Sequence, residues 1–170
     1  MSMVFLHWQI SRFLLAQQAA ATVPSDIQGL FDRPDVHVTQ RVMTLEKIAR
    51  LIEGGEDNLS VITRFNHADD EVANDLMICD HSEMWDKASI AARPHLIVIG
   101  DTVENLEKAL GKEKFVTLRI GFLNGPLEKL PQFLAWFDIV ITGEQALDVP
   151  RRIIAEIVAG KGRIAKKELS

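Results

Sequence analysis

Asp101 directly follows a short apolar run and has a side chain that could do chemistry. Residues 96–99 read Leu-Ile-Val-Ile, and Gly100-Asp101-Thr102 comes next. An acidic group at the tip of such a strand lies where α/β enzymes hold a metal ion or a phosphate. The same carboxylate would also suit the N-cap of a helix over residues 102–110. The two roles are compatible, so Asp101 is a candidate metal ligand and ligand contact.

Polar residues also end two other apolar runs. Thr63 lies near the end of residues 59–65, where its hydroxyl could bind a phosphate, although a β-branched threonine also suits a strand. Asp80-His81 follows residues 75–79 and could act as an orienting pair. With Ser82 it reads equally well as a turn and a helix cap. A purely structural role is therefore an alternative to the functional role for each of these residues.

The elements that would position these residues alternate along the chain. Thr44 is the predicted N-cap of the first of four helices, and Pro150 falls in the first turn of the last. Continuously apolar strands separated by helices predict a parallel sheet covered on both faces. The expected fold is a three-layer, mainly parallel, Rossmann-like α/β domain, with ligands bound at the carboxyl ends of its strands. The predicted strands are residues 59–65, 75–79, 96–100, 115–120 and 137–142, and the predicted helices are residues 45–53, 82–92, 102–110 and 147–158.

Residues 96–105, Leu-Ile-Val-Ile-Gly-Asp-Thr-Val-Glu-Asn, resemble the fourth motif of the haloacid dehalogenase-like (HAD) superfamily of phosphohydrolases. Residues 59–63 resemble its second motif, and residues 137–157 its final strand and helix. The resemblance extends from about residue 4 to residue 157 and implies a HAD-like fold. It implies that the Thr63 hydroxyl contacts the phosphoryl group. It also implies a third-motif cation, for which Lys87 is preferred and Arg93 is the competitor.

The first motif of the superfamily is the part that this chain does not reproduce. On the resemblance, a strand over residues 3–6 leads into His7, Gln9 and Ser11, which fill the slots of the nucleophile, the general acid/base and a threonine. An aspartyl-phosphate requires a carboxylate, which His7 lacks. Gln9 cannot transfer a proton. Alternatively, residues 3–22 form one amphipathic helix, which would make this alignment wrong and favour a receiver-like domain.

Magnesium binding is expected to be weak or absent. Mg²⁺ prefers hard oxygen ligands, usually carboxylates with phosphate and water. On the resemblance, Asp101 supplies one ligand, but Asn105 fills the position of the downstream acid, and Glu104 is out of phase by one residue. Mg²⁺ is therefore expected as a cofactor only if the protein is active.

Three functions follow from these residues. The first is a catalytically degenerate HAD-like domain that binds a small phosphorylated ligand or a protein partner and acts as a binding or regulatory module. The second is a divergent magnesium-dependent phosphohydrolase, with His7 or an acid such as Asp80 in an altered role. The third is a receiver-like signalling or interaction module, for which Asp80 and Asp101 could form the acidic cluster.

Length and composition set the remaining bounds. The 170 residues fit a single domain over 1–170, in which residues 24–42 read as a loop or flap and leave room for a very small cap at most. Residues 161–170 form a basic tail.

The net charge of −5 disfavours nucleic acid as a partner. No apolar run is long enough for a membrane span, and the N-terminus lacks the early charges of a signal peptide, so the cytoplasm is expected. Cys79 is the single cysteine and reads as a core residue. The sequence leaves the oligomeric state open.

Overall fold

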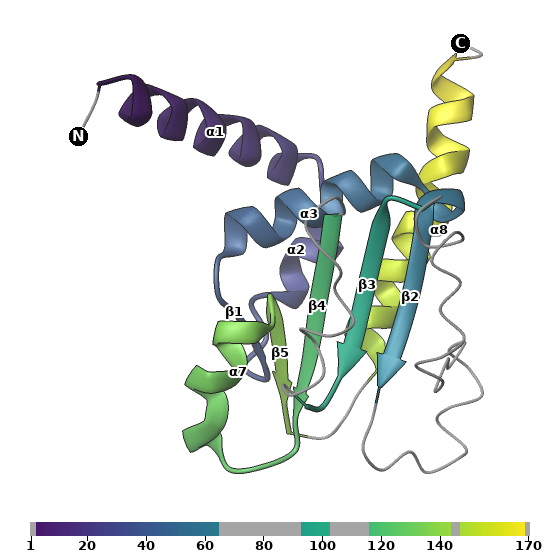
Figure 1. The fold of residues 1–170 in the computed structure, drawn as a ribbon. Helices are drawn as coiled ribbons and strands as arrows, with labels where there is room; N and C mark the ends of the chain where they lie inside the picture. Colours follow the sequence, from purple (N-terminus) through teal and green to yellow (C-terminus); the bar gives the residue numbers. More distant parts are fainter. Residues whose placement is uncertain (1–2, 65–92, 103–115, 144–146, 169–170) are drawn as a thin grey trace.

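A five-stranded sheet forms the centre of the computed structural model, which describes residues 3–64, 93–102, 116–143 and 147–168 (Figure 1). The strand order is β1-β5-β4-β3-β2. Strands β2 to β5 run parallel to their neighbours, whereas β1 pairs antiparallel with β5 at the edge. The strands are β1 (Val36–Val38), β2 (Leu59–Arg64), β3 (His95–Gly100), β4 (Val116–Leu123) and β5 (Ile139–Thr142).

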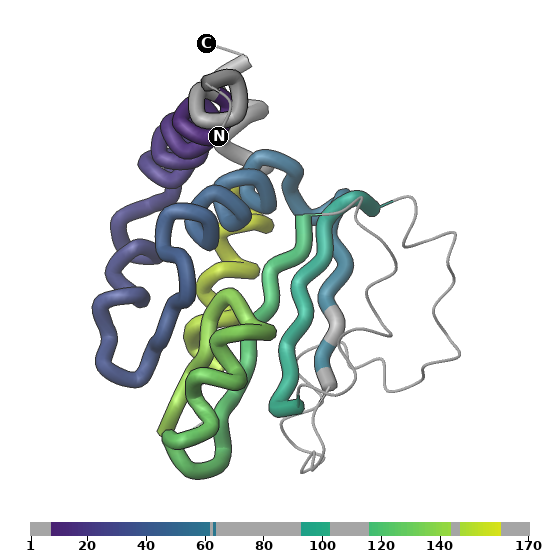
Figure 2. Tube along the Cα trace, turned by 60° about the vertical axis from the view of Figure 1, so that its left-hand side comes forward, coloured from purple at the N-terminus to yellow at the C-terminus, as the bar shows by residue number. Residues whose placement is uncertain are grey.

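Helices cover both faces of this sheet and give it three layers. Helices α3 and α8 pack on one face, and the short helix α7 packs on the other (Figures 1 and 2). Helix α1 joins the body near α3 and projects away from it. The helices are α1 (Met3–Ala21), α2 (Ser25–Leu30), α3 (Arg41–Gly54), α7 (Leu130–Trp136) and α8 (Asp148–Glu168), with 3₁₀ turns at η1 (Glu56–Asn58) and η2 (Leu127–Lys129).

Strand β3 shows why the apolar runs predict a doubly covered sheet. Successive side chains of a strand point to opposite faces. Ile97 and Ile99 belong to the core between the sheet, α3 and α8, whereas Leu96 and Val98 belong to the smaller core under α7. Because both faces are buried, the strand is apolar at every position. The predicted α/β class, the parallel sheet and the three layers are confirmed.

Two short elements lie where the sequence predicted a loop or flap. Residues 24–42 contain helix α2 and strand β1, so that prediction is wrong. Strand β1 has three residues, and its partner β5 lies about 100 positions further along the chain. Its local sequence is too short to carry a strand pattern, and pairing with a distant strand stabilises it.

The ends of two helices also differ from their predictions. Thr44 is not an N-cap, because α3 begins at Arg41 and Thr44 is buried inside it. The N-cap residue is Gln40, which makes no capping bond through its side chain. Helix α8 begins at Asp148 with Pro150 in its first turn, as predicted, and continues to Glu168, so most of the basic tail belongs to a helix.

Several predictions concern residues outside the described part of the chain. They are the strand over residues 75–79, the helices over residues 82–92 and 102–110, and the side chains of Cys79, Asp80, His81, Lys87 and Asn105. Among the helices that are described, none combines the length and the apolar character that crossing a bilayer would need.

Candidate functional site

The carboxyl ends of β2 and β3 bring two predicted site residues to neighbouring positions. The two strands are directly hydrogen-bonded and parallel, with Thr63 opposite Ile99 and Arg64 opposite Gly100. Asp101 is the next residue after Gly100. Thr63 and Asp101 therefore lie at adjacent strand ends on the edge of the sheet where ligands bind in folds of this class.

The hydroxyl of Thr63 is buried near the carboxyl end of β2. The residue is 2% exposed, and no hydrogen bond to Oγ1 is found among the described residues. Buried polar atoms are normally paired, and an unpaired one costs about 1–3 kcal/mol. A strand residue chosen only for its shape would not need this hydroxyl. Thr63 is thus a candidate donor to a ligand at the strand end.

Asp101 is half-buried at the same edge and offers carboxylate oxygens. Of the residues that the structure describes, no three or more His, Cys, Asp or Glu side chains are grouped so that they could hold a metal ion. A single carboxylate does not meet the preference of Mg²⁺ for six oxygen ligands. The described residues therefore do not by themselves form a magnesium site.

The first-motif slots do not lie at a strand end. His7, Gln9 and Ser11 are inside helix α1, so the strand predicted over residues 3–6 is wrong and the single-helix alternative is confirmed. A helical residue on α1 cannot occupy the tip of a strand in the sheet. Moreover, β2 pairs directly with β3, which leaves no place between them for a further strand.

The competing third-motif cation lies on the wrong edge. Arg93 precedes β3, and its guanidinium donates to the carbonyl oxygen of Leu59 at 3.2 Å. Leu59 begins β2, so Arg93 is at the amino edge of the sheet, opposite to Thr63 and Asp101. Arg93 is thereby excluded from contact with a ligand at the carboxyl edge. Lys87 lies outside the described residues.

A polar cluster at the carboxyl end of β5 was not predicted. Arg33 donates to both carboxylate oxygens of Asp35, at 3.0 and 2.6 Å, and also to Asp148 in the first turn of α8. The hydrogen bond from Arg33 lowers the pKa of Asp35, and the bonds to Asp35 and Asp148 raise the pKa of Arg33. Because Arg33 bonds to both residues, it joins Asp35, just before β1, to the first turn of α8.

Asp35 and its neighbour His37 also hold the last residue of β5. The backbone N–H of Thr142 donates to the carbonyl oxygen of Asp35 at 2.9 Å, and its hydroxyl lies 3.1 Å from Nε2 of His37. Gly143 follows with a φ of 88°, a left-handed conformation that favours glycine. The signal in the sequence was the polar stretch Asp-Arg-Pro-Asp before residues 36–38, but its partners at residues 142 and 148 are far away in the chain.

The chain is similar in sequence to known 5'-nucleotidases. The family model described as Pyrimidine 5'-nucleotidase (UMPH-1) matches residues 36–158. A 7-methylguanosine phosphate-specific 5'-nucleotidase of Drosophila melanogaster is 31% identical over 86 residues, which is 49% of this chain and 26% of that protein. The B form from Xenopus laevis is 36% identical over 72 residues, which is 41% of this chain and 25% of that protein.

A solved structure is similar as well. The crystal structure of cytosolic 5'-nucleotidase IIIB bound to cytidine aligns with a TM-score of 0.41 and 24% identity, over 55% of this chain and 30% of that one. The chain spans about a quarter of the length of the curated relatives that it matches. The resemblance to the HAD superfamily, to which these nucleotidases belong, is confirmed. Since the family model covers more than half of its residues, the chain belongs to the pyrimidine 5'-nucleotidase (UMPH-1) family.

Proposed function

We propose that the chain is part of a phosphohydrolase that acts on nucleoside 5'-monophosphates, and that the carboxyl edge of β2 and β3 binds their phosphate. The observation that carries this proposal is the buried Thr63 hydroxyl, which has no hydrogen-bond partner among the described residues and lies at a strand end next to the strand that leads into Asp101. The family and the names of the relatives support a phosphate ester of a nucleoside as the substrate. This is the second of the three functions predicted from the sequence.

The two residues would have different roles. The Thr63 hydroxyl would donate a hydrogen bond to a phosphoryl oxygen, a bond to a charged group that is worth about 1.5–3 kcal/mol. The Asp101 carboxylate would position a cation or a water beside that phosphate. If the protein is active, the HAD resemblance implies Mg²⁺ as a cofactor, to which Asp101 would supply one carboxylate ligand. The cytoplasm remains the expected compartment.

Phosphate release tests this function directly. Purified protein would be incubated with Mg²⁺ and cytidine or 7-methylguanosine 5'-monophosphate, and inorganic phosphate would be measured over time. The proposal predicts turnover that Asp101→Asn lowers by about 100-fold or more, while Asp26→Asn, an exposed carboxylate on α2, leaves the rate unchanged. Equal rates for the two variants would contradict the role of Asp101.

A second candidate is a nucleotide-binding module without hydrolysis, the degenerate domain that the sequence first suggested. It is favoured by the helical conformation of residues 3–21, because His7 and Gln9 then provide no nucleophile at a strand end. The same samples discriminate between the candidates. Saturable binding of the monophosphate without phosphate release would support the module, and the absence of both would contradict both candidates.

A further inference from the structure

The loop between β4 and α7 begins beyond the end of β3. Gly100, the last residue of β3, pairs with Gly121, and β4 continues for two more residues, to Leu123. Two residues of a strand extend about 6–7 Å. Residues 124–129, which we call the β4 loop, therefore start past the level of Gly100, and Figure 1 shows them beyond the lower ends of β3 and β4. The β4 loop thus lies at the same carboxyl edge as Asp101.

Lys129, the last residue of the β4 loop, folds back toward the strand. Its Cδ atom lies 4.0 Å from the point where a Cβ atom of Gly125 would be. Gly125 is the second residue after β4, so the aliphatic stem of Lys129 points toward the strand end. The side chain is exposed, and its ammonium group forms no ion pair or hydrogen bond within the described part of the chain. Lys129 therefore offers this edge a positive charge that a ligand can reach.

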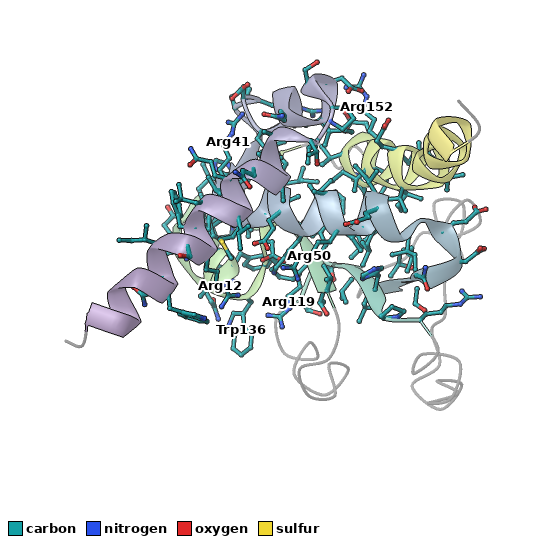
Figure 3. The ribbon with its side chains drawn as sticks, turned by 90° about the horizontal axis from the view of Figure 1, so that it is seen from above. Arg12, Arg41, Arg50, Arg119, Trp136 and Arg152 are labelled. Atoms are coloured by element: carbon teal, nitrogen blue, oxygen red, sulfur yellow. The ribbon has the colours of Figure 1, made fainter. Side chains whose placement is uncertain are left out.

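Most other cations with described side chains are bonded or lie elsewhere. Arg33 is at the same edge but is already bonded to two carboxylates. Arg93 is at the amino edge, where it bonds to the start of β2. Arg152 belongs to α8, and Figure 3 shows it and Trp136, the last residue of α7, on opposite sides of α3. Three further cations form ion pairs: Arg41 with Asp32, Lys47 with Asp138 and Arg50 with Glu46.

A phosphate at the ends of β2 and β3 needs a positive partner. A phosphate monoester carries close to two negative charges near neutral pH. The carboxylate of Asp101 adds another at the same edge, and like charges repel. The hydroxyl of Thr63 is neutral and does not balance them. Neighbouring strands are about 4.8 Å apart, so the long side chain of Lys129 can span the distance from the end of β4 to that of β3.

We propose that Lys129 binds the phosphate of the nucleoside 5'-monophosphate and is the cation of the carboxyl-edge site. This inference rests on the proposed function and adds to it a residue outside the motifs of the HAD resemblance. A lysine ammonium group binds phosphate as a point charge with three donors. Asn124, which is exposed directly after β4, offers an amide that can donate to the same ligand.

Titration calorimetry of the full chain with cytidine 5'-monophosphate and with cytidine tests this contact. Lys129→Gln should weaken binding of the monophosphate about tenfold. It should leave the affinity for cytidine unchanged, because cytidine has no phosphate. Lys129→Arg keeps the charge and should recover most of the affinity. Arg152→Gln is the matched control, because it removes one positive charge from an exposed position on α8, and it should leave both affinities unchanged.

Three outcomes would overturn the inference and leave the proposed function in place. In the first, Thr63→Val weakens binding of the monophosphate and Lys129→Gln does not. In the second, Lys129→Gln and Arg152→Gln weaken it equally, which would assign the effect to net charge. In the third, Lys129→Gln weakens cytidine and the monophosphate alike, which would assign it to the fold.

A different outcome would contradict the proposed function itself. If the unsubstituted chain binds no monophosphate, the phosphate site and the role of Lys129 are overturned together. Because Lys129 is exposed, Lys129→Gln is expected to fold, and circular dichroism would confirm that it does.

Discussion

The ammonium group of Lys47 lies 2.6 Å from Oδ1 of Asp138 and joins the middle of α3 to the start of β5. The second oxygen of Asp138 accepts the backbone N–H of Arg119 in β4 at 2.9 Å. The backbone carbonyl of Asp138 accepts the N–H of Thr39, just after β1. One aspartate therefore connects a helix to three strands of the sheet.

Replacing Asp138 should destabilise the fold more than replacing Lys47. Asp138→Ala leaves the Arg119 N–H and the Lys47 ammonium without their acceptor, and should lower the free energy of unfolding by about 2–3 kcal/mol. Lys47→Met should cost less than about 1 kcal/mol, because the Lys47 side chain is 35% exposed and solvent screens the pair. Urea denaturation measures both values. Equal losses for the two variants would show that the Arg119 contact contributes nothing.

Gly121 should not accept a side chain. A Cβ atom at this position in β4 would lie 2.6 Å from ring atoms of Phe137, which is tightly packed in the smaller core. Gly121→Ala should lower the free energy of unfolding by about 1–3 kcal/mol, as overpacked cores do. Gly29→Ala is the matched control, because an added Cβ meets nothing within 4 Å there. The midpoint temperature of thermal unfolding should be higher for Gly29→Ala than for Gly121→Ala, and the reverse order would refute the packing argument.

His95 should make the fold less stable in mild acid. Burial lowers the pKa of His95, and the charge of Arg50 lowers it further, while Glu53 acts in the opposite direction. The unfolded chain, with a pKa of about 6.5, then binds the proton more tightly than the folded chain. The stability present above about pH 6.5 is therefore lost as the pH falls through that value toward the folded pKa.

A comparison of two pH values isolates this effect. The urea midpoint should fall between about pH 7.5 and about pH 5.5, and it should fall less in His95→Gln, which has no proton to bind. Hydrogen bonds from Arg41 and Arg33 lower the pKa values of Asp32 and Asp35 from the ordinary value of an aspartate, so the stability that these carboxylates contribute is lost only at lower pH. An equal fall in both proteins would exclude His95 as the cause.

The apolar runs predicted the sheet because a strand that is buried on both faces is apolar at every position. Residues 59–64, 95–100 and 139–142 form strands close to their predicted positions, and α8 begins within one residue of its prediction. The N-terminal run failed because a short apolar segment fits a strand and a helix equally well. Residues 3–6 continue into an apolar, alanine-rich stretch, and the length of the whole run decides for the helix α1.

The site was predictable where it depends on strand ends and unpredictable where it depends on distant contacts. Thr63 and Asp101 end neighbouring strands, and the rule that parallel strands present their carboxyl ends together was enough to pair them. Arg33 and Asp148 are 115 residues apart, and no local pattern relates them. His7, Gln9 and Ser11 were assigned to the first motif from the spacing of residues along the chain. Spacing alone does not determine whether the backbone there is a strand or a helix.

The substitution Thr63→Val distinguishes a hydroxyl that binds a ligand from one that stabilises the fold. Valine keeps the shape of threonine and removes a buried hydroxyl that has no partner among the described residues. The variant should therefore be more stable by about 1 kcal/mol in urea denaturation. If the same hydroxyl donates to a phosphate, the gain in stability should come with a loss of binding. A loss of stability would show that the hydroxyl is satisfied in the unliganded protein.

Calorimetric titration of cytidine 5'-monophosphate into Thr63→Val tests the phosphate site most directly. The matched control is Thr117→Val, which makes the same substitution in β4 near the amino edge of the sheet. The account predicts that Thr63→Val binds the nucleotide about tenfold or more weakly than the unsubstituted chain, while Thr117→Val binds it equally well. Unchanged affinity in Thr63→Val would contradict a phosphate site at the carboxyl ends of β2 and β3.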